Sequence, residues 1–415
     1  MVHIALVSGW QTVNIGDVAH TPGALEALRR FGPDDLRLTL WARNIDDGVR
    51  RLLARYYPEI ELVEDQLGSD GELTPGLEQL FADADLLVHG SGPSFVARRE
   101  IAAWARHTDK PYGVFGITLD PLTPYHATLS RAAEMIDAID GNLLDVEDRA
   151  LLEGAAFVYC RDSLSLRYLQ GQGVSVPVLA FGPDATVIFD PVDDADGAEV
   201  LQGFALEPGR FLCAVPRLRF TPYPAIRGYP PRTEDRRKAA YSAGYRDSDL
   251  DVLRQSIITW VRETGQPALI VPEMSYEPEL AEQYLAGTFP ADVTDAVRML
   301  PRFWDLTEAC AVYRHAAAVV SMECHSPLMA LAEGVPALYL RQPTDTIKGQ
   351  MYADLGLQDN VVELAESGPS DAVQKLSKII SDPAAAGDLA HRSRKRSHER
   401  LQDMVKVAVE AAQTG

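Results

Sequence analysis

The sequence predicts an α/β protein with two doubly wound, Rossmann-like domains that face a cleft. Short apolar runs alternate with helical patterns, first over residues 3–180 and again over residues 211–340. This alternation is typical of parallel sheets covered by helices on both faces. An acidic, apolar-poor stretch at residues 190–197 separates the two series, which favours a domain boundary there.

The first series builds an N-terminal domain, residues 1–190, whose apolar runs have the length of buried strands. The expected strands are His3–Val7, Leu36–Leu40, Leu86–His89, Tyr112–Gly116, Gly141–Leu144, Phe157–Cys160 and Val178–Ala180. The expected helices are Thr21–Phe31, Gly48–Tyr56, Gly76–Ala82, Glu100–His107 and Ser163–Gln170.

The second series follows a linker expected at residues 191–209 and builds a C-terminal domain, residues 210–385. Its expected strands are Phe211–Val215, Ala268–Val271, Val297–Leu300, Ala317–Val320 and Ala337–Leu340, and its expected helices are Asp249–Thr264, Pro278–Tyr284, Thr307–Arg314 and Pro327–Glu333. Residues 386–415 are predicted to form a helix that packs back across the body, because a basic run such as His391 to Arg400 is typical of a solvated helix face.

Composition excludes several classes of protein. The 415 residues, 46% of them hydrophobic, are enough for two cores, and no apolar stretch reaches the roughly 20 residues of a membrane helix. A net charge of −21 disfavours nucleic acid as a partner. The first residues indicate a strand rather than a secretory leader, so we expect a cytoplasmic protein; the sequence leaves its oligomeric state open.

The four cysteines are spread along the chain without the spacing of a metal site. They are Cys160, Cys213, Cys310 and Cys324. Three lie within or beside apolar runs, which favours small buried core residues over disulfide partners. Asp17, Asp162 and Asp184 are scattered as well, and we therefore predict no metal site.

Two polar loops follow predicted strands near opposite ends of the chain. Asn14-Ile15-Gly16-Asp17 follows the first strand, and His325 follows the strand that ends at Val320. Parallel α/β sheets bind ligands at the carboxyl ends of their strands. The turn Gly90-Ser91-Gly92 lies at a third strand end, so these segments are predicted to line one cleft.

Positive residues also lie at strand ends. Arg161, Arg217 and Arg219 each stand at or just past one, and guanidinium groups suit bidentate recognition of anions. Arg161 is alternatively an ion-pair partner of an aspartate nearby. A basic island with interleaved tyrosines, residues 217–247, is interrupted by prolines; we predict a lid over the cleft, with a solvated, mobile loop as the alternative.

The motifs, taken in order, resemble those of the polysaccharide pyruvyl transferase family. The resemblance covers residue 1 to about residue 357, apart from the basic island. The segments that carry it are Asn14-Ile15-Gly16-Asp17, His89-Gly90-Ser91-Gly92, Arg161-Asp162-Ser163-Leu164-Ser165, Gly182-Pro183-Asp184-Ala185 and the segment from His325 to Pro336.

This resemblance implies a GT-B-like fold of two facing domains. It also implies phosphoenolpyruvate as the donor and transfer of its pyruvate unit onto a sugar as a ketal, with release of phosphate and without a further cofactor. The family's functional arginine, histidine and lysine fall on Arg161, His325 and Lys348. Glu323 stands where the family usually has an arginine.

These implications assign expected roles. A histidine is suited to giving and taking the protons of ketal formation, and His325 is the best placed; its alternative role is to cap the helix or to pair with Glu323. The expected catalytic residues are His325 and Arg161. The expected donor-binding residues are Arg217, Arg219, Lys348, Glu333 and Ser326, and the expected acceptor-binding residues are Asn14, Asp17, Gly90, Ser91 and Gly92.

Two other functions stay open at this stage. A nucleotide-sugar glycosyltransferase would use Glu333-Gly334-Val335-Pro336 as a donor-ribose loop in the same fold, because a fold alone does not choose a chemistry. A non-catalytic glycan-binding relative is suggested by Glu323. The expected partners are a small-molecule donor and a carbohydrate acceptor, and a lipid-linked acceptor would bring the protein to a membrane surface.

Overall fold

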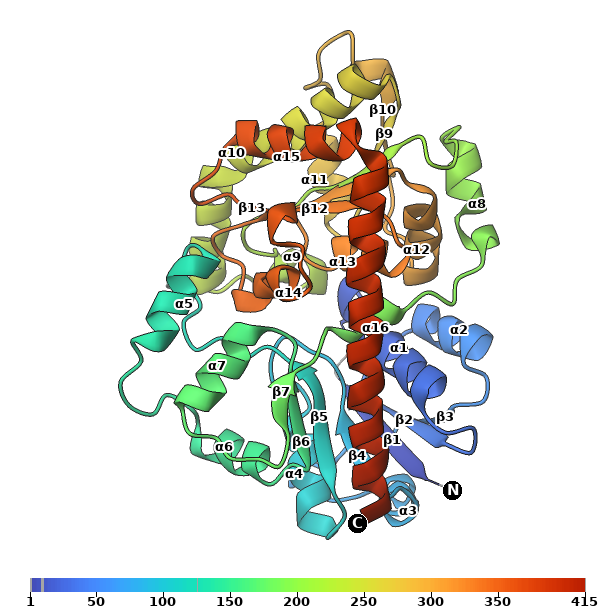
Figure 1. The fold of residues 1–415 in the computed structure, drawn as a ribbon, viewed down its shortest axis with the longest axis vertical. Coiled ribbons are helices and arrows are strands. Elements are labelled where there is room, and N and C mark those ends of the chain that lie inside the picture. The colour runs from blue at the N-terminus through green and yellow to red at the C-terminus, as the bar shows by residue number, and fades with distance from the viewer. Residues whose placement is uncertain (1, 9–10, 125, 415) are drawn as a thin grey trace.

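The computed structural model describes residues 2–8, 11–124 and 126–414 and contains two parallel sheets covered by helices (Figure 1). The first sheet has seven strands in the order β3-β2-β1-β4-β5-β6-β7, and the second has six in the order β10-β9-β8-β11-β12-β13. Neighbouring strands pair in parallel throughout. The predicted class, two doubly wound α/β domains, is confirmed.

The N-terminal sheet and its helices are formed by the first half of the chain. The strands are β1 (His3–Ser8), β2 (Arg37–Ala42), β3 (Glu61–Val63), β4 (Leu86–His89), β5 (Tyr112–Ile117), β6 (Phe157–Cys160) and β7 (Leu179–Phe181). The helices are α1 (Ile15–Phe31), α2 (Asp47–Tyr56), α3 (Pro75–Asp83), α4 (Arg98–His107), α5 (Leu129–Asp137), α6 (Val146–Glu153) and α7 (Ser163–Gly171), followed by a short 3-10 helix, Ala185–Ile188.

The second sheet and its helices are formed by the second half of the chain. The strands are β8 (Leu212–Val215), β9 (Ala268–Ile270), β10 (Val297–Met299), β11 (Ala318–Ser321), β12 (Ala337–Arg341) and β13 (Val361–Glu363). The helices are α8 (Asp194–Gly203), α9 (Tyr223–Arg227), α10 (Thr233–Thr264), α11 (Glu277–Tyr284), α12 (Leu306–His315), α13 (Ser326–Ala332), α14 (Gln350–Asp354), α15 (Pro369–Ser381) and α16 (Pro383–Thr414).

One predicted strand, Gly141–Leu144, is wrong. The segment is an irregular loop in which Gly141 has a φ of 98° and the Leu144 backbone N–H donates to Asn142 Oδ1 at 3.1 Å. Leu143 is 56% exposed, so the apolar residues that suggested a strand do not all enter the core. A short asparagine side chain that bonds its own backbone competes with sheet pairing.

Helix α1 begins at Ile15, six residues before the predicted start. Asn14 is its N-cap, since the Asn14 side chain accepts a hydrogen bond from the Asp17 backbone N–H at 3.0 Å. Asp17 therefore lies inside the first turn, where a carboxylate interacts favourably with the helix dipole. Pro22 is accommodated within α1.

The acidic stretch expected as a linker contains a folded helix, α8. The helix begins with a capping box formed by Asp193 and Asp196, which satisfies backbone donors of the first turn. It packs on α12, and a Cβ added at Gly197 would lie 3.0 Å from Ala311 Cβ. The acidic residues thus serve helix formation rather than chain flexibility.

The basic island is largely helical, which corrects the expected start of the long helix at Asp249. Helix α10 starts at Thr233, two residues after Pro231, the last proline of the island, and the Arg232 backbone N–H donates to Asp235 Oδ2 at 2.9 Å. Helix α9 reaches the N-terminal domain: Gln11 Nε2 donates to Tyr223 Oη at 3.0 Å, and Arg227 donates to Gln11 Oε1 at 2.9 Å.

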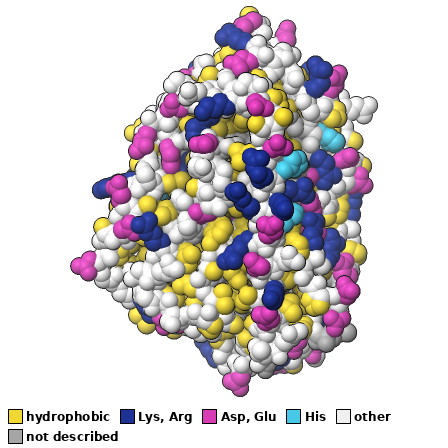
Figure 2. Space-filling view, in the orientation of Figure 1, with side chains coloured by type: hydrophobic (Ala, Val, Ile, Leu, Met, Phe, Trp, Pro, Cys, Tyr) yellow, Lys and Arg dark blue, Asp and Glu magenta, His cyan; other side chains and the backbone are white. Residues whose placement is uncertain are grey.

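Helix α16 runs along both domains (Figure 1). It contacts α1 and β4 in the N-terminal domain and α13 and α15 in the C-terminal domain. Leu401, Met404 and Val405 on this helix are fully buried, whereas Lys and Arg side chains gather over its middle on the outer face (Figure 2). Within the described part of the chain, no helix combines the length and apolarity needed to cross a membrane.

The four cysteines are free and buried. Burial of Cys324 raises the pKa of its thiol to about 12. An uncharged thiol is a poor nucleophile, so none of these residues indicates cysteine chemistry.

Candidate functional site

The site is built where the N-terminus of α1 meets the C-terminal domain. The Ile15 backbone N–H donates to the Glu273 carbonyl at 3.0 Å, and that of Ser275 donates to the Val13 carbonyl at 2.9 Å. Asn14 and Met274 form an isolated antiparallel bridge between these bonds. The two segments follow β1 and β9, so carboxyl ends of strands from both sheets meet at this junction.

Gly16 lies directly against His325. A Cβ added at Gly16 would be 2.4 Å from His325 Cβ and 2.6 Å from its Nδ1, a separation that real atoms do not tolerate. His325 immediately precedes α13 and is 2% exposed. The two loops that the sequence placed at one cleft are therefore in contact.

His325 is held as a buried, neutral imidazole. Its Nδ1 lies 3.2 Å from Glu273 Oε1, while its Nε2 has no hydrogen-bond partner among the described residues. Burial lowers the pKa of His325 well below its usual value, and the positive charge of Lys348 lowers it further. When the Nδ1–H group donates a hydrogen bond to Glu273, Nε2 carries a lone pair that can accept a proton.

Glu273, which the sequence did not single out, anchors this arrangement. Its Oε2 accepts hydrogen bonds from the Ser326 backbone N–H at 2.6 Å and from Ser326 Oγ at 2.8 Å. Tyr313 also donates to Ser326 Oγ at 3.0 Å. Ser326, a predicted donor-binding residue, thus positions Glu273, and the signal that could have revealed Glu273 is its place just after β9.

Arg161 follows β6 and is completely buried. Its Nε donates to Thr118 Oγ1 at 2.8 Å, and its NH1 donates to Asp184 Oδ2 at 2.5 Å. Its NH2 has no partner among the described residues. Burial alone would raise the pKa of Asp184, but the charges of His20 and Arg161 hold it well below its usual range. The ion-pair alternative for Arg161 is therefore realised with Asp184, and one guanidinium nitrogen remains unpaired.

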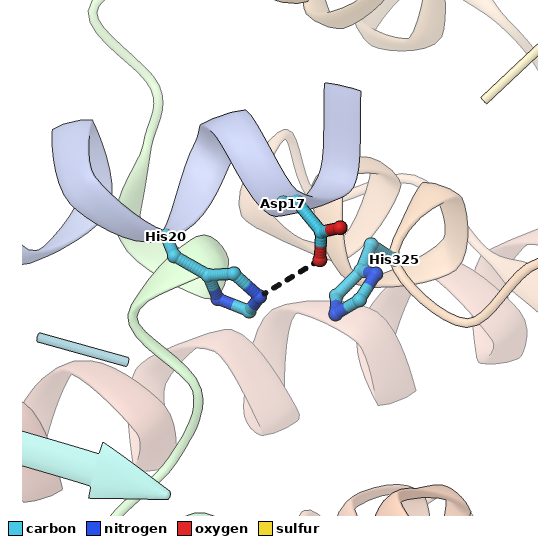
Figure 3. Close-up of side chains that lie close together, drawn as sticks. All are labelled: Asp17, His20 and His325. Atoms are coloured by element: carbon cyan, nitrogen blue, oxygen red, sulfur yellow. Dashed lines mark ion pairs between the residues drawn. The ribbon is translucent and has the colours of Figure 1, made fainter. Parts of the chain in front are cut away.

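His20 joins these groups and was not anticipated from the sequence. Its Nδ1 lies 3.1 Å from Asp184 Oδ1, and its Nε2 lies 3.8 Å from Asp17 Oδ1 and 3.4 Å from Arg161 NH1. The His20 and His325 rings are 4.8 Å apart and nearly perpendicular; Figure 3 shows both beside Asp17. The structure thereby connects Arg161 and His325 through His20.

Further charged residues from the C-terminal domain stand beside this cluster. Arg217 Nε lies 3.0 Å from Glu323 Oε1, and Arg217 also pairs with Asp345. Burial raises the pKa of Glu323 to about 7. Lys348 lies in the short 3-10 helix Ile347–Gly349 and forms no ion pair with a described carboxylate, although its charge acts on His325 and Glu323.

Two predicted donor-binding residues have partners elsewhere. Both Asp249 oxygens accept hydrogen bonds from Arg219, at 2.7 and 2.9 Å, and the Arg219 guanidinium lies 3.7 Å from the Tyr245 ring centroid. Glu333 lies at the far end of α13 from His325 and pairs with Arg314 at 2.7 Å. The structure does not bring these two side chains to the histidines.

The Gly90-Ser91-Gly92 turn lies beside Arg161. A Cβ added at Gly116 would be 3.2 Å from Ser91 Oγ and 3.8 Å from Arg161 Cβ. Ser91 is 1% exposed, and its hydroxyl has no partner among the described residues. The turn itself is fixed by the Gly92 backbone N–H, which donates to the Gly116 carbonyl at 3.0 Å.

Among the described residues, Asp17, His20 and His325 also have the spacing of metal ligands. One ligand atom from each lies within 4.8 Å of the others. The Arg161 guanidinium is 3.4 Å from His20 Nε2, and Lys348 acts on His325. These positive charges oppose a cation and favour an anion.

Open space lies outside this cluster. A cavity of about 480 Å³ is lined by Gln11, Thr12, Val13, Arg43, Asn44, Gln66 and Arg227. A groove of about 560 Å³ lies between α2 and residues 302–308, and Thr12 lines both this groove and the cavity. His20 and His325 are each 2% exposed, and we expect a ligand to reach them when the domain junction opens.

Two facing Rossmann-like domains with a buried polar site between their carboxyl edges form a GT-B-like fold. UDP-GlcNAc 2-epimerase from Neisseria meningitidis bound to UDP-GlcNAc matches with a TM-score of 0.58 and 12% identity, covering 99% of this chain and 100% of that one. Anabaena Alr3699/HepE in complex with UDP matches with a TM-score of 0.54 and 14% identity, covering 100% and 99%. S. aureus MnaA with UDP matches with a TM-score of 0.55 and 12% identity, covering 94% and 91%.

The family model of polysaccharide pyruvyl transferase matches residues 14–342. The chain therefore belongs to this family of transferases, as its motifs indicated. A search of curated protein sequences found no significant match.

Proposed function

We propose that the protein transfers the pyruvate unit of phosphoenolpyruvate onto two hydroxyls of a sugar in a glycan or glycan precursor, as a ketal, with release of phosphate. The observation that carries the proposal is a set of unpaired polar groups from both domains at one buried place. Arg161 NH2 and His325 Nε2 have no partner among the described residues, and Lys348 has no ion-pair partner among them. Buried polar groups are normally satisfied: an anionic ligand would pair with Arg161 and Lys348, and a ligand hydroxyl would donate to His325 Nε2.

The chemistry of the donor matches these groups. Phosphoenolpyruvate carries a phosphate and a carboxylate, and a guanidinium binds such groups in a fixed planar geometry, whereas a lysine acts as a point charge. Arg217 Nε lies 3.0 Å from Glu323 Oε1. Arg217 therefore places a guanidinium beside position 323, where the family usually has an arginine. Glu323 holds Arg217 in place, and phosphoenolpyruvate contacts Arg161, Lys348 and Arg217.

The acceptor sugar is assigned to the N-terminal side. Asp17 keeps 20% of its side chain exposed, and the Ser91 hydroxyl is unpartnered. Both can bind sugar hydroxyls, with Gly90 and Gly92 allowing close approach of the backbone. Asn14 contributes by fixing the first turn of α1.

The direct test is phosphate release from phosphoenolpyruvate with a panel of acidic and neutral oligosaccharides. We expect acceptor-dependent phosphate release, a product heavier by one pyruvate ketal, and loss of both in His325→Gln. An exposed histidine outside the cluster, His107, supplies the control variant His107→Gln, which should keep full activity. Absence of turnover with every acceptor would contradict the proposal.

A nucleotide-sugar donor is the second candidate, because the similar solved structures include complexes with UDP and UDP-GlcNAc. A thermal-shift comparison separates the two donors, since a ligand that binds only the folded state raises the melting temperature. Stabilisation by UDP or GDP without stabilisation by phosphoenolpyruvate would favour glycosyl transfer. Carbohydrate binding without turnover of either donor would favour a non-catalytic role.

A further inference from the structure

The buried cluster contains two histidines in matched settings. His20 Nδ1 lies 3.1 Å from Asp184, and His325 Nδ1 lies 3.2 Å from Glu273. Each imidazole is thus oriented through Nδ1 by a buried carboxylate, and the rings are 4.8 Å apart. A carboxylate that holds Nδ1 fixes the tautomer and leaves Nε2 available for proton transfer.

The charges around the two rings differ. His20 faces the carboxylates of Asp184 and Asp17, with the Arg161 guanidinium 3.4 Å from its Nε2 and the Thr186 hydroxyl 3.5 Å from its Nδ1. A carboxylate oxygen thus lies within 4 Å of each His20 ring nitrogen. His325 faces Glu273 but also the positive charges of Lys348 and Arg161, which favour a neutral imidazole.

We propose that His20, oriented by Asp184, is a second proton-transfer group and acts as the acid while His325 acts as the base. The assignment rests on the proposed pyruvyl transfer. Among the described residues, the two ring nitrogens of His20 face Asp184, Thr186, Asp17 and Arg161.

The protons and electron pairs balance over two steps. In the first step the C2–C3 π electrons of phosphoenolpyruvate take the proton of His20 to form the methyl group. The first sugar hydroxyl forms a bond to C2 and gives its proton to His325. In the second step the C2–O bond to phosphate breaks, and the leaving oxygen takes the proton from His325. The second hydroxyl bonds to C2 and returns a proton to His20, which restores both residues.

The test compares His20→Gln with the wild-type protein, using His3→Gln as the matched control. His3 is also a buried histidine with a side-chain hydrogen bond, 2.8 Å to Thr39, but it lies at the amino end of β1. We expect kcat of His20→Gln to fall about 10²- to 10⁴-fold, the range of a lost acid or base. The Kd for phosphoenolpyruvate, measured by calorimetry, should stay within about threefold, and His3→Gln should keep its kcat.

A purely structural role for His20 would not change the pH profile. The wild-type profile of kcat should fall at high pH, where the acid is deprotonated, and this limb should disappear in His20→Gln. Asp17→Asn removes one carboxylate beside Nε2 at a partly exposed position, so it should move the same limb to lower pH. This second variant keeps the assignment testable if His20→Gln does not fold.

The outcomes separate the two proposals. No phosphate release by the wild-type protein with any acceptor would overturn the proposed function and the assignment together. Turnover by the wild type with an unchanged kcat and pH profile in His20→Gln would overturn only the assignment. Stoichiometric metal in the purified protein that is lost in His20→Gln, with activity lost after chelation, would make Asp17, His20 and His325 metal ligands and would also overturn it.

Discussion

Gly16 shows how a single missing side chain brings the two domains into contact. Its Cα faces His325 so closely that Gly16→Ala forces a shift of the junction. We expect the variant to lose about 1–3 kcal/mol of unfolding free energy, the usual range for overpacking, together with most activity. Urea unfolding and the phosphate-release assay measure the two effects.

The control for this variant is Gly171→Ala at the end of α7. An added Cβ there meets no atom within 4 Å, so stability should change by less than about 1 kcal/mol. Equal effects of the two substitutions would show that the contact between Gly16 and His325 does not constrain the protein.

Glu323 makes a pH-dependent contribution to stability. Burial raises the pKa of this carboxyl from 4.5 to about 7, so the folded state holds the proton more tightly than the unfolded state. By linkage, the contribution of Glu323 is most favourable below pH 4.5 and is lost as the pH rises to about 7. Glu323→Gln removes the titration, while Arg217 keeps its ion pair with Asp345.

We therefore expect Glu323→Gln to gain stability relative to the wild type as the pH rises. The unfolding free energies at pH 5 and pH 8 should show a relative gain on the order of 1–3 kcal/mol. A stability difference between the two proteins that is the same at both pH values would contradict the assigned titration.

At the scale of elements, the strand ends were predictable and most predicted helices start within two residues of the observed position, whereas the starts of α1 and α10 lie six and 16 residues before the predicted ones. Gly16, Arg161 and His325 follow apolar runs that are strands, and this rule places them at one edge of each sheet. His20 was missed because Pro22 obscured the start of α1. With the helix begun at Ile15, Asp17 and His20 are three residues apart and share a face.

Two further errors have local causes, whereas the omission of Glu273 has a tertiary one. The apolar residues at 141–144 resemble a strand, yet Asn142 bonds the backbone of its own turn. Acidic residues at 193–196 suggested a linker but form a capping box. Glu273 follows β9 in the same way that Arg161 follows β6, but a single glutamate belongs to no recognisable sequence motif. Its contacts with His325 and Ser326 form only in the tertiary fold.

Helix α16 supplies a prediction at this scale. Met404 is fully buried and lies close enough to Gly182 that a Cβ there would meet its Sδ at 2.4 Å. Met404→Ala should cost about 2–5 kcal/mol of unfolding free energy. Lys406→Ala, at a side chain 75% exposed on the same helix, should change it by less than about 0.5 kcal/mol. Similar denaturation midpoints for the two variants would show that α16 contributes little to the core.

For the whole molecule, we expect the domains to separate during turnover, because both histidines of the site are buried. Asn14 and Met274 offer a way to prevent this, because the bonds that flank them make them a non-hydrogen-bonded antiparallel pair. Such pairs have Cα atoms about 4.5 Å apart, which a disulfide can span. We expect the oxidised Asn14→Cys/Met274→Cys variant to be inactive and to recover activity when reduced.

The single variants Asn14→Cys and Met274→Cys, treated with the same oxidant, control for loss of the helix cap and for the oxidant itself. They should show no dependence of activity on the reductant. Full activity of the cross-linked protein would mean that substrates reach the histidines without opening of this junction.

In the proposed function, Arg161 from one domain and Lys348 from the other hold the same small anion beside His325. Isothermal titration calorimetry with phosphoenolpyruvate measures this directly in the wild-type protein, Arg161→Gln and Lys348→Gln. We expect one site per chain in the wild type and an affinity at least about tenfold weaker in each variant, since a lost charged hydrogen bond costs about 1.5–3 kcal/mol. No binding to the wild type, or equal binding to all three folded proteins, would contradict it.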